Sequence, residues 1–313
     1  MSSAVTCVTV RVPAKVNVQL AVGAARPDGF HDLANVFLAV SLYDEVTATP
    51  AESLTVTCAG PDADQVPLDR TNLAARAAEL LAARNGLAPS VHLHIEKRIP
   101  VAGGMAGGSA DGAAALLACD ALWGLRTPVE ELLSLCAELG SDVPFSLVGG
   151  AALGTGRGEI LTPVEAGTFH WVFAVAEGGL STPAVFREFD RLTAEVEVPA
   201  PEASPALLAA LAAGDPDALA ATLANGLQPA ALSLRPSLAD TLAAGTGAGA
   251  LAALVSGSGP TTAFLVRDAE SAAKVAAALD ASATCRSTHL ATGPAPGATC
   301  LQPSAGGGEG VAT

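Results

Sequence analysis

A strand pattern over residues 91–95 leads into a glycine-rich turn, and an apolar helix pattern over residues 110–123 follows it. This turn, which is also called the phosphate turn below, consists of Pro100, Val101, Ala102, Gly103, Gly104, Met105, Ala106, Gly107, Gly108, Ser109 and Ala110. Glycine tolerates positive φ and lets the backbone approach a ligand closely. Amide groups and the positive end of the helix dipole then point into the turn. The sequence therefore predicts a strand–turn–helix unit that cradles a polyphosphate.

The turn differs from two widespread phosphate motifs, because it has neither Gly-Lys-Ser/Thr nor the spacing Gly-x-Gly-x-x-Gly. The hydroxyl of Ser109 can cap the helix, donate to a phosphate or coordinate Mg²⁺. The alternative interpretation is a turn that only connects two elements, but the flanking strand and helix favour binding. A second cluster, Gly247-x-Gly249-x-x-Ala252, has no clear strand before it, and we interpret it as accidental.

An N-terminal strand is predicted over residues 8–20, where apolar and polar side chains alternate. Its apolar face carries Ala14, Val16, Val18 and Leu20. Its other face carries Lys15, Asn17 and Gln19. We therefore expect this strand to be half buried. After the turn signal Asp28-Gly29, further strands are predicted over residues 35–40, 45–48, 170–176 and 263–266.

Helices are predicted over residues 71–84 and 268–279, and at four capping residues that are each followed by proline. These pairs are Thr127-Pro128, Thr182-Pro183, Ser204-Pro205 and Asp215-Pro216. Strands and helices mix without a regular βαβ alternation, which favours an α+β fold. We predict an N-terminal domain over residues 1–162, a C-terminal domain over 163–292, and a disordered Gly/Ala/Pro-rich tail over 293–313.

The net charge of -15 restricts the partners of the chain. An acidic protein repels phosphate polymers, so neither nucleic acid nor an anionic membrane is an expected partner. The six cysteines are scattered without a CxxC pair, which indicates reduced thiols and a cytoplasmic protein. Residues 1–11 lack a signal-peptide pattern, and no apolar stretch reaches the length of a membrane span. No oligomeric state is predicted.

Three segments together resemble the GHMP kinase superfamily. They are Pro13-Ala14-Lys15-Val16-Asn17, the glycine-rich turn, and Val255-Ser256-Gly257-Ser258-Gly259-Pro260-Thr261. Two more segments resemble the members that act on a cytidine-diphosphate-linked methylerythritol. They are Arg26-Pro27-Asp28-Gly29-Phe30-His31-Asp32-Leu33 and Leu139-Gly140-Ser141-Asp142-Val143-Pro144-Phe145. The similarity covers residues 10–267.

The resemblance implies an N-terminal domain like ribosomal protein S5 domain 2 and a ferredoxin-like C-terminal domain. It also implies that ATP, with Mg²⁺, phosphorylates the tertiary 2-hydroxyl of 4-(cytidine 5'-diphospho)-2-C-methyl-D-erythritol on the non-mevalonate route to isoprenoid precursors. The turn departs from the family pattern at Ala102, Met105 and Ala106, where glycine, leucine and glycine are common. Alanine at a positive-φ position costs roughly 1 kcal/mol, so the nucleotide affinity is expected to differ.

By this resemblance, Lys15 and Asp142 form the catalytic pair. A carboxylate can orient the acceptor hydroxyl and take its proton, while an ammonium stabilises the charge that develops on the transferred group. Judged from spacing alone, Asp142 suits a helix cap before Pro144, and Lys15 suits a solvated strand residue. The resemblance favours catalysis for both residues.

We assign substrate binding to Asn17, Phe30, His31 and Phe186, of which the resemblance implies Phe30 and His31. Asn17 shares a strand face with Lys15, so both side chains can address one substrate. Phe30, usually tyrosine in the family, stacks on the cytosine, and His31 binds the polar edge of the base, largely through its backbone. Phe186 either completes the aromatic sandwich or packs in the core. Support for the phosphate turn is expected from Ser256, Gly257, Ser258 and Gly259.

Two other interpretations of the function remain open at this point. A homoserine or mevalonate-type kinase would share the scaffold, although its acceptor has no base for Phe30 and His31 to bind. A non-catalytic nucleotide-binding protein would not need both Lys15 and Asp142. The histidines His92 and His94, together with Glu96, hint at a metal site, but a solvated strand face explains their alternation better.

Overall fold

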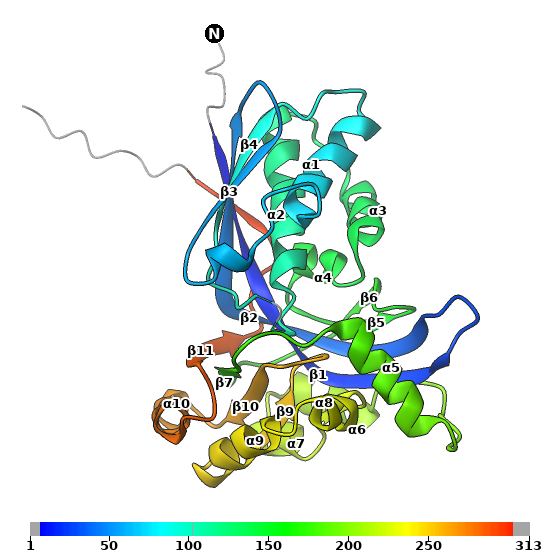
Figure 1. Ribbon diagram of the computed structural model, residues 1–313, viewed down its shortest axis with the longest axis vertical. Coiled ribbons are helices and arrows are strands. Elements are labelled where there is room, and N and C mark those ends of the chain that lie inside the picture. The colour runs from blue at the N-terminus through cyan, green and yellow to red at the C-terminus, as the bar shows by residue number, and fades with distance from the viewer. Residues whose placement is uncertain (1–6, 102, 303–313) are drawn as a thin grey trace, which may run out of the picture.

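The computed structural model describes residues 7–101 and 103–302 of the 313-residue chain. Two β-sheets form its framework, with helices packed on each of them (Figure 1). Within the described residues, no helix is both long and apolar enough to cross a bilayer.

The larger sheet has eight strands in the order β12-β1-β2-β4-β3, and β5, β6 and β8 branch from this path. Its strands are β1 (Val8–Ala25), β2 (His31–Pro50), β3 (Thr55–Ala59), β4 (Val91–Glu96), β5 (Ala151–Thr155), β6 (Ile160–Pro163), β8 (Ala224–Asn225) and β12 (Thr299–Leu301). The strands β1 and β2 form a long antiparallel hairpin, which turns at Gly29 with φ 81°. The separate strands predicted over 35–40 and 45–48 are parts of the single strand β2.

The prediction that β1 is half buried is wrong. Its polar face, with Lys15, Asn17 and Gln19, is as buried as its apolar face. Helix α2 (Gly107–Trp123) covers the apolar side, whereas the phosphate turn and segments of the C-terminal half cover the polar side. The strand therefore lies between two layers, and its polar groups bond to protein rather than to water.

Four helices and one short 3-10 turn accompany the first sheet. They are η1 (Ala63–Gln65), α1 (Leu73–Arg84), α2, α3 (Val129–Leu139) and α4 (Val143–Val148). Asn72 caps α1 by accepting a hydrogen bond from the amide of Ala74. Helix α2 packs between α1 and the sheet, where its many alanines allow close approach of the backbones.

Helix α2 begins at Gly107, three residues before the predicted start at residue 110. Ala106, with φ 60°, occupies the N-cap position, and its carbonyl accepts the amide of Ala110. Ser109 therefore lies within the first turn of the helix and is not its cap.

The second sheet has the antiparallel order β11-β7-β10-β9. Its strands are β7 (Phe169–Val175), β9 (Ala252–Val255), β10 (Thr262–Val266) and β11 (Ser287–Gly293). Its helices are α5 (Thr182–Thr193), α6 (Pro205–Ala213), α7 (Pro216–Ala220), α8 (Gln228–Leu234), α9 (Leu238–Gly247) and α10 (Ala269–Ser282). The order of elements, with helices between β7 and β9 and between β10 and β11, is ferredoxin-like. The predicted two-part α+β fold is confirmed.

Strand β7 connects the two halves of the molecule, because one of its faces packs in the core of the first sheet and the other packs against helices of the second sheet. Trp171 and Phe173 belong to the core of the first sheet, while Val172 and Ala174 pack with α9 and α10 on the opposite side. Helices α9 and α10 lie on the side of the second sheet that faces away from the first (Figure 1).

Two of the four predicted proline-headed helices begin as expected. Ser204 caps α6 and Asp215 caps α7 through their side chains. Helix α3 begins at Val129, one residue after Pro128, and α5 begins at Thr182, with Ser181 as its N-cap. In α3 and α5 the N-cap residue makes no side-chain capping bond among the described residues, and each helix starts one residue away from its predicted position.

The chain returns to the first sheet at its C-terminal end. The expectation of a disordered tail is wrong for residues 293–302. Gly293 ends β11, Ala295 is buried, Pro296 forms a β-bridge with Gly149, and β12 pairs antiparallel with β1. Residues 303–313 of the predicted tail lie outside the described part of the chain. Strands β8 and β12 follow residue 163 in the sequence, but both pair with β1 of the first sheet. The domain division at residues 162 and 163 stays a prediction.

Candidate active site

A cleft of about 750 Å³ lies where the two halves of the molecule meet. Its walls are the glycine-rich turn, the β1–β2 hairpin, the start of α4, helix α5 and the turn after β9. The predicted site residues that line it are Lys15, Asn17, Phe30, His31, Gly103, Gly104, Ala106, Gly107, Gly108, Ser109, Asp142, Phe186, Gly257, Ser258 and Gly259. Segments far apart in the sequence thus share one cavity.

The first turn of α2 opens onto this cleft. Gly107, Gly108 and Ser109 line it at the point where backbone amides have no acceptor within the helix. Such amides, together with the helix dipole, bind anions. Ala106 stands where the family commonly has glycine, and it adopts the left-handed conformation with positive φ.

Not every residue predicted for the phosphate turn lines the cleft. Met105 and Ala110 are fully buried in the core, and Pro100 and Val101 lie outside the lining. The side chains of Met105 and Ala110 therefore support the turn from behind. Ala102 is outside the described residues.

The turn after β9 packs directly on the phosphate turn. The carbonyl of Gly104 accepts hydrogen bonds from Ser256 Oγ at 3.1 Å and from Lys15 Nζ at 2.9 Å. The amide of Thr261 donates to the carbonyl of Gly103 at 3.2 Å. Segment 256–261 thus holds the phosphate turn in contact with β1.

Gly104→Ala is expected to lower the free energy of unfolding by about 3 kcal/mol or more, since a backbone clash adds to positive-φ strain. Gly104 has φ +76°, and a Cβ there would lie 2.1 Å from the carbonyl oxygen of Ser256. Denaturant unfolding measures the change. Gly86→Ala is the matched control, because Gly86 has φ +65° with open space around it. Equal losses in the two variants would contradict the clash.

Lys15 and Asp142 meet in the cleft, although 127 positions separate them in the chain. Lys15 Nζ lies 3.6 Å from Asp142 Oδ2. The ammonium also donates to Asn17 Oδ1 at 2.6 Å, and Asn17 Nδ2 donates to Asn35 Oδ1 at 2.7 Å. Lys15 is only 5% exposed, so it is not a solvated strand residue.

Burial lowers the pKa of Lys15 from its usual value, and the carboxylate of Asp142 opposes this shift. Asp142 stands at the N-cap position of α4, but among the described residues its side chain makes no capping hydrogen bond. Its carboxylate instead faces the cleft with about a third of its surface exposed. A carboxylate that can accept a proton thus lies beside a fixed ammonium.

Aromatic side chains gather at another part of the cleft. The ring of His31 lies against that of Phe186, with centroids 4.9 Å apart, and His31 Nε2 is 2.8 Å from Asp190 Oδ1. Phe30 is 48% exposed, and the guanidinium of Arg157 lies 5.1 Å from its ring centroid. An exposed ring beside polar groups suits a planar heteroaromatic ligand.

Sequence analysis missed several residues of the cleft. They are Asn35, Ser141, Arg157, Thr182, Arg187 and Asp190. A signal was present for Asn35, since it is the one polar residue in an apolar strand run over 34–40. The two arginines carried no signal, because exposed arginines are common and only the fold brings these to the cleft.

Two weaker sequence signals lie outside the cleft. His92 contacts Thr55 and Thr57, and His94 contacts Glu96, all on a partly exposed face of the sheet. Within the described residues, no group of three or more His, Cys, Asp or Glu side chains could hold a metal ion. Gly247 ends α9, and Gly249 lies in the turn before β9, so no strand precedes that glycine cluster.

The chain is similar to known proteins along most of its length. Residues 72–150 match the family model for the GHMP kinases N terminal domain, and residues 207–284 match that for GHMP kinases C terminal. Over 295 residues the chain is 76% identical to 4-diphosphocytidyl-2-C-methyl-D-erythritol kinase of Streptomyces avermitilis, which covers 94% of this chain and 99% of that protein. The protein of the same name from Thermobifida fusca is 61% identical over 308 residues, with 96% and 100% covered.

Solved structures show a similar fold. A crystal structure of 4-(cytidine 5'-diphospho)-2C-methyl-D-erythritol kinase superposes with a TM-score of 0.75 at 32% identity, over 91% of this chain and 99% of that one. A homoserine kinase from Cytophaga hutchinsonii gives a TM-score of 0.74 at 18% identity, over 96% and 99%. At that identity the second likeness concerns the fold alone.

Proposed function

The chain belongs to the GHMP kinase family, and we propose that it transfers the γ-phosphoryl group of ATP to the 2-hydroxyl of 4-(cytidine 5'-diphospho)-2-C-methyl-D-erythritol. This reaction belongs to the non-mevalonate route to isoprenoid precursors. Relatives of high identity carry this substrate in their names. The observation that carries the proposal is a single cleft with three features: the open end of α2, the Lys15–Asp142 pair and an aromatic wall.

The triphosphate of ATP is proposed to bind the amides of Gly107, Gly108 and Ser109. Their position in the first turn of α2 and their exposure to the cleft support this assignment. Gly103 and Gly104 form the facing wall, and the contacts of Gly104 with Lys15 and Ser256 hold that wall in place. The anion then lies directly beside the catalytic pair.

Asp142 is proposed to accept a hydrogen bond from the 2-hydroxyl and to take its proton as the phosphoryl group is transferred. Phosphoryl transfer passes through a loose transition state, so the proton moves late and orientation of the oxygen matters most. The O–P bond to ADP breaks while the new O–P bond forms at the acceptor oxygen. Asp142 ends the step protonated and returns the proton to solvent through its exposed side.

Lys15 is proposed to stabilise the negative charge that is shared between the acceptor oxygen and the γ-phosphoryl group. Its ammonium lies 3.6 Å from the carboxylate of Asp142, so both groups can face the same acceptor oxygen. Hydrogen bonds to Asn17 and to the carbonyl of Gly104 restrict its position. Asn17 is also proposed to contact the acceptor, since it lines the same wall.

The cytidine end of the acceptor is proposed to bind at the aromatic wall. Phe30 offers an exposed ring for stacking, with His31 and Phe186 beside it. Stacking of this kind contributes on the order of 1–3 kcal/mol per base. Arg157 and Arg187 line the cleft as cations that suit the diphosphate of the substrate.

Mg²⁺ is proposed to enter with ATP rather than to occupy a protein cage. Mg²⁺ binds hard oxygen ligands and is commonly held by one or two side chains together with substrate phosphates. The hydroxyl of Ser109 offers such an oxygen in this cleft. When bound, the ion neutralises negative charge on the phosphates.

The proposed partners are therefore ATP and the cytidyl substrate, with neither a nucleic-acid polymer nor a membrane surface. The net charge of -15 supports this, since it repels phosphate polymers. We propose the cytoplasm as the location, because the six cysteines are free thiols and that compartment keeps thiols reduced.

A phosphotransfer assay with ATP-Mg²⁺ and the cytidyl substrate tests the proposal. Stoichiometric ADP and a phosphorylated acceptor are the expected products. CDP and CMP should also raise the melting temperature and compete with the acceptor, whereas homoserine and mevalonate should not be phosphorylated. Turnover of those alcohols without any effect of cytidine nucleotides would indicate another kinase of the superfamily. Binding of nucleotides without transfer to any acceptor would indicate a non-catalytic protein.

A further inference from the structure

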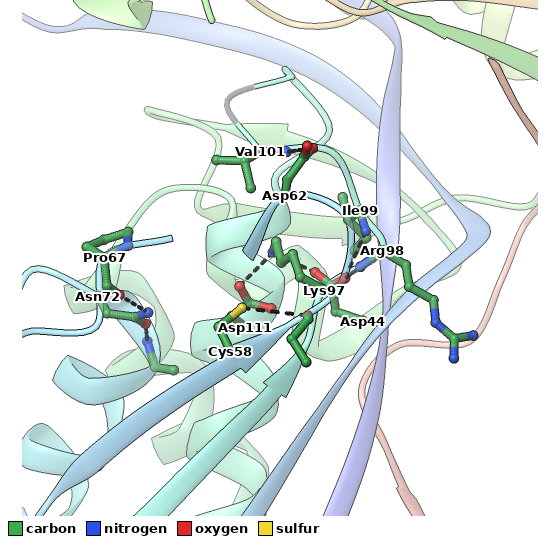
Figure 2. A network of polar contacts seen from close by, with 12 residues as sticks. Asp44, Cys58, Asp62, Pro67, Asn72, Lys97, Arg98, Ile99, Val101 and Asp111 are labelled. Carbon is green, nitrogen blue, oxygen red and sulfur yellow. Dashed lines mark hydrogen bonds and ion pairs between the residues drawn. The ribbon is translucent and has the colours of Figure 1, made fainter. Parts of the chain in front are cut away.

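Behind the phosphate turn lies a buried ion cluster that the proposed reaction does not use. Lys97 directly follows β4, and its ammonium lies between two carboxylates (Figure 2). Lys97 Nζ donates to Asp44 Oδ2 and to Asp111 Oδ2, each at 2.6 Å. Asp44 belongs to β2, and Asp111 belongs to the first turns of α2. We call these three residues the clasp.

The clasp joins the two arms of the phosphate turn. Asp44 Oδ1 accepts the amides of Arg98 at 2.6 Å and Ile99 at 2.8 Å, on the arm that enters the turn. Asp111 lies on the arm that leaves the turn as α2. Lys97 bridges the two carboxylates (Figure 2), so residues 97–99 cannot separate from the start of α2 without breaking charged hydrogen bonds.

The ammonium of Lys97 also lies so close to Gly107 that a side chain at this position would be crowded. A Cβ on Gly107 would lie 3.0 Å from Lys97 Nζ and 3.1 Å from Ile99 Cγ2. The side chain of Lys97 therefore passes directly under the first residue of α2, on the side away from the cleft. A shift of this side chain would move the amides that face the ligand.

The clasp is isolated from water, since the side chains of Lys97, Asp44 and Asp111 are 2%, 0% and 4% exposed. Removing one partner from such a buried ion group leaves an uncompensated charge, which is strongly destabilising. Asp111 Oδ1 is buried without a hydrogen-bond partner among the described residues. The cluster therefore has one carboxylate oxygen more than its cation satisfies.

The charge of the clasp depends on Asp111. Burial, followed by the negative charge of Asp44, raises the pKa of Asp111 to about 8, although Lys97 opposes this. Burial alone would lower the pKa of Lys97, but the carboxylates of Asp111 and Asp44 raise it. Cys58 on β3 is a further titratable neighbour, and burial raises its pKa to about 11. Loss of the Asp111 proton, at a pH above the usual range for a carboxyl, therefore makes the charge of the clasp more negative by one unit.

We propose that the clasp is a positioning device for the phosphate turn, in which Lys97 sets the affinity for ATP by holding the first turn of α2 against the entering strand. This inference deepens the proposed function and rests on it for the identity of the nucleotide. With Asp111 protonated, the clasp leaves the anion site at the helix terminus undisturbed. With Asp111 ionised, it places one more negative charge directly behind the amides that bind the triphosphate.

The first test compares Asp111→Asn with the wild type while ATP is varied between pH 6.5 and 9.5. In the wild type, the KM for ATP is expected to rise roughly tenfold above about pH 8, as one unit charge acts on the anion through the protein interior. Asparagine keeps the shape and cannot ionise, so this rise should be absent from Asp111→Asn. Parallel pH profiles of KM in the two enzymes would overturn the proposal.

Asp120→Asn is the matched control, because Asp120 is a second buried acid of α2. Its Oδ1 accepts the amide of Thr127 at 3.0 Å, far along the helix from the phosphate turn. An amide oxygen can keep that bond. Asp120→Asn is expected to retain the wild-type pH profile, and loss of the alkaline rise in this variant would also overturn the proposal.

Lys97→Gln separates positioning from a merely structural role. We expect the KM for ATP to rise about tenfold at neutral pH, while kcat and the KM for the cytidyl substrate change less than about twofold. A purely structural role would instead lower kcat through the loss of folded enzyme and leave both KM values unchanged. Melting temperature and circular dichroism report the folded fraction. Should Lys97→Gln fail to fold, Asp111→Asn alone decides the proposal.

Direct binding of ADP, measured by calorimetry at pH 7 and pH 9, distinguishes this inference from the proposed function. If the wild type binds ADP with the expected loss of affinity at pH 9 but phosphorylates no cytidyl acceptor, the clasp stands and the proposed acceptor fails. If the wild type phosphorylates the acceptor while Asp111→Asn shows the same loss of ADP affinity, the clasp fails and the proposed function stands.

Discussion

Asp142→Asn is expected to lower kcat by about three to four orders of magnitude, the upper range for loss of a positioned proton acceptor. The amide has the size of the carboxylate but cannot take the proton of the acceptor hydroxyl. The KM for ATP should change less than about twofold, since the side chain is proposed to face the acceptor and, among the described residues, is paired with Lys15 and makes no capping hydrogen bond. Initial rates of ADP formation at saturating acceptor measure the loss.

The control for this variant is Asp240→Asn, an exposed acid-to-amide change in the first turn of α9. Its kcat should equal that of the wild type. Near-normal turnover by Asp142→Asn would mean that the proton acceptor has been misassigned. A loss accompanied by a comparable rise in the KM for ATP would point instead to a distorted phosphate turn.

Lys15→Met is expected to lower kcat by roughly two to three orders of magnitude, as for removal of one fixed electrostatic stabiliser. The change should also raise the KM for ATP, because the bond from the ammonium to the carbonyl of Gly104 is lost. Methionine fills similar space and leaves no buried charge behind. Steady-state kinetics with both substrates varied separates the two effects. Full kcat in Lys15→Met would remove the ammonium from the mechanism.

The pH profile of the wild type gives an independent check on Lys15. Because burial holds the pKa of Lys15 below its usual value of 10.5, the ammonium loses its proton at lower pH than an exposed lysine. Raising the pH removes the cation, so kcat should fall on the alkaline side. In Lys15→Met this alkaline limb should be absent. An unchanged limb in the variant would assign it to another group.

Combining the two substitutions tests whether they act as a pair. Residues that act as one unit are strongly non-additive. With Lys15 Nζ 3.6 Å from Asp142 Oδ2, the double variant should lose about as much activity as the more impaired single variant. Fully additive losses would mean that the two groups act on separate steps.

Much of the local structure could be predicted from the sequence. The strand over 91–95, the helix capped by Asn72 and the glycine-rich turn have signals within a few neighbouring residues. The boundaries of α2 were less predictable, because Gly107 and Gly108 can occupy either a turn or a helix. The alternation in β1 indicated a strand correctly but could not reveal that its polar face is covered.

The contacts between distant segments could not be predicted from local patterns. Lys15 on β1 meets Asp142 before α4, and both Lys15 and Ser256 bond to the carbonyl of Gly104. A resemblance to a family identified Lys15 and Asp142, but nothing in their own neighbourhoods did. The two arginines of the cleft and the clasp partner Asp44 likewise look like ordinary surface charges in the sequence.

The sequence by itself determined that a strand, a glycine-rich turn and a helix stand in succession, because backbone preferences act between residues a few positions apart. It also determined, through motif resemblance, which family scaffold the chain adopts. Only the tertiary structure decided which polar side chains are buried and paired, as with Lys97 between Asp44 and Asp111. Burial and charge pairing depend on what packs against a residue from elsewhere in the chain, and hydrophobic periodicity carries no record of those partners.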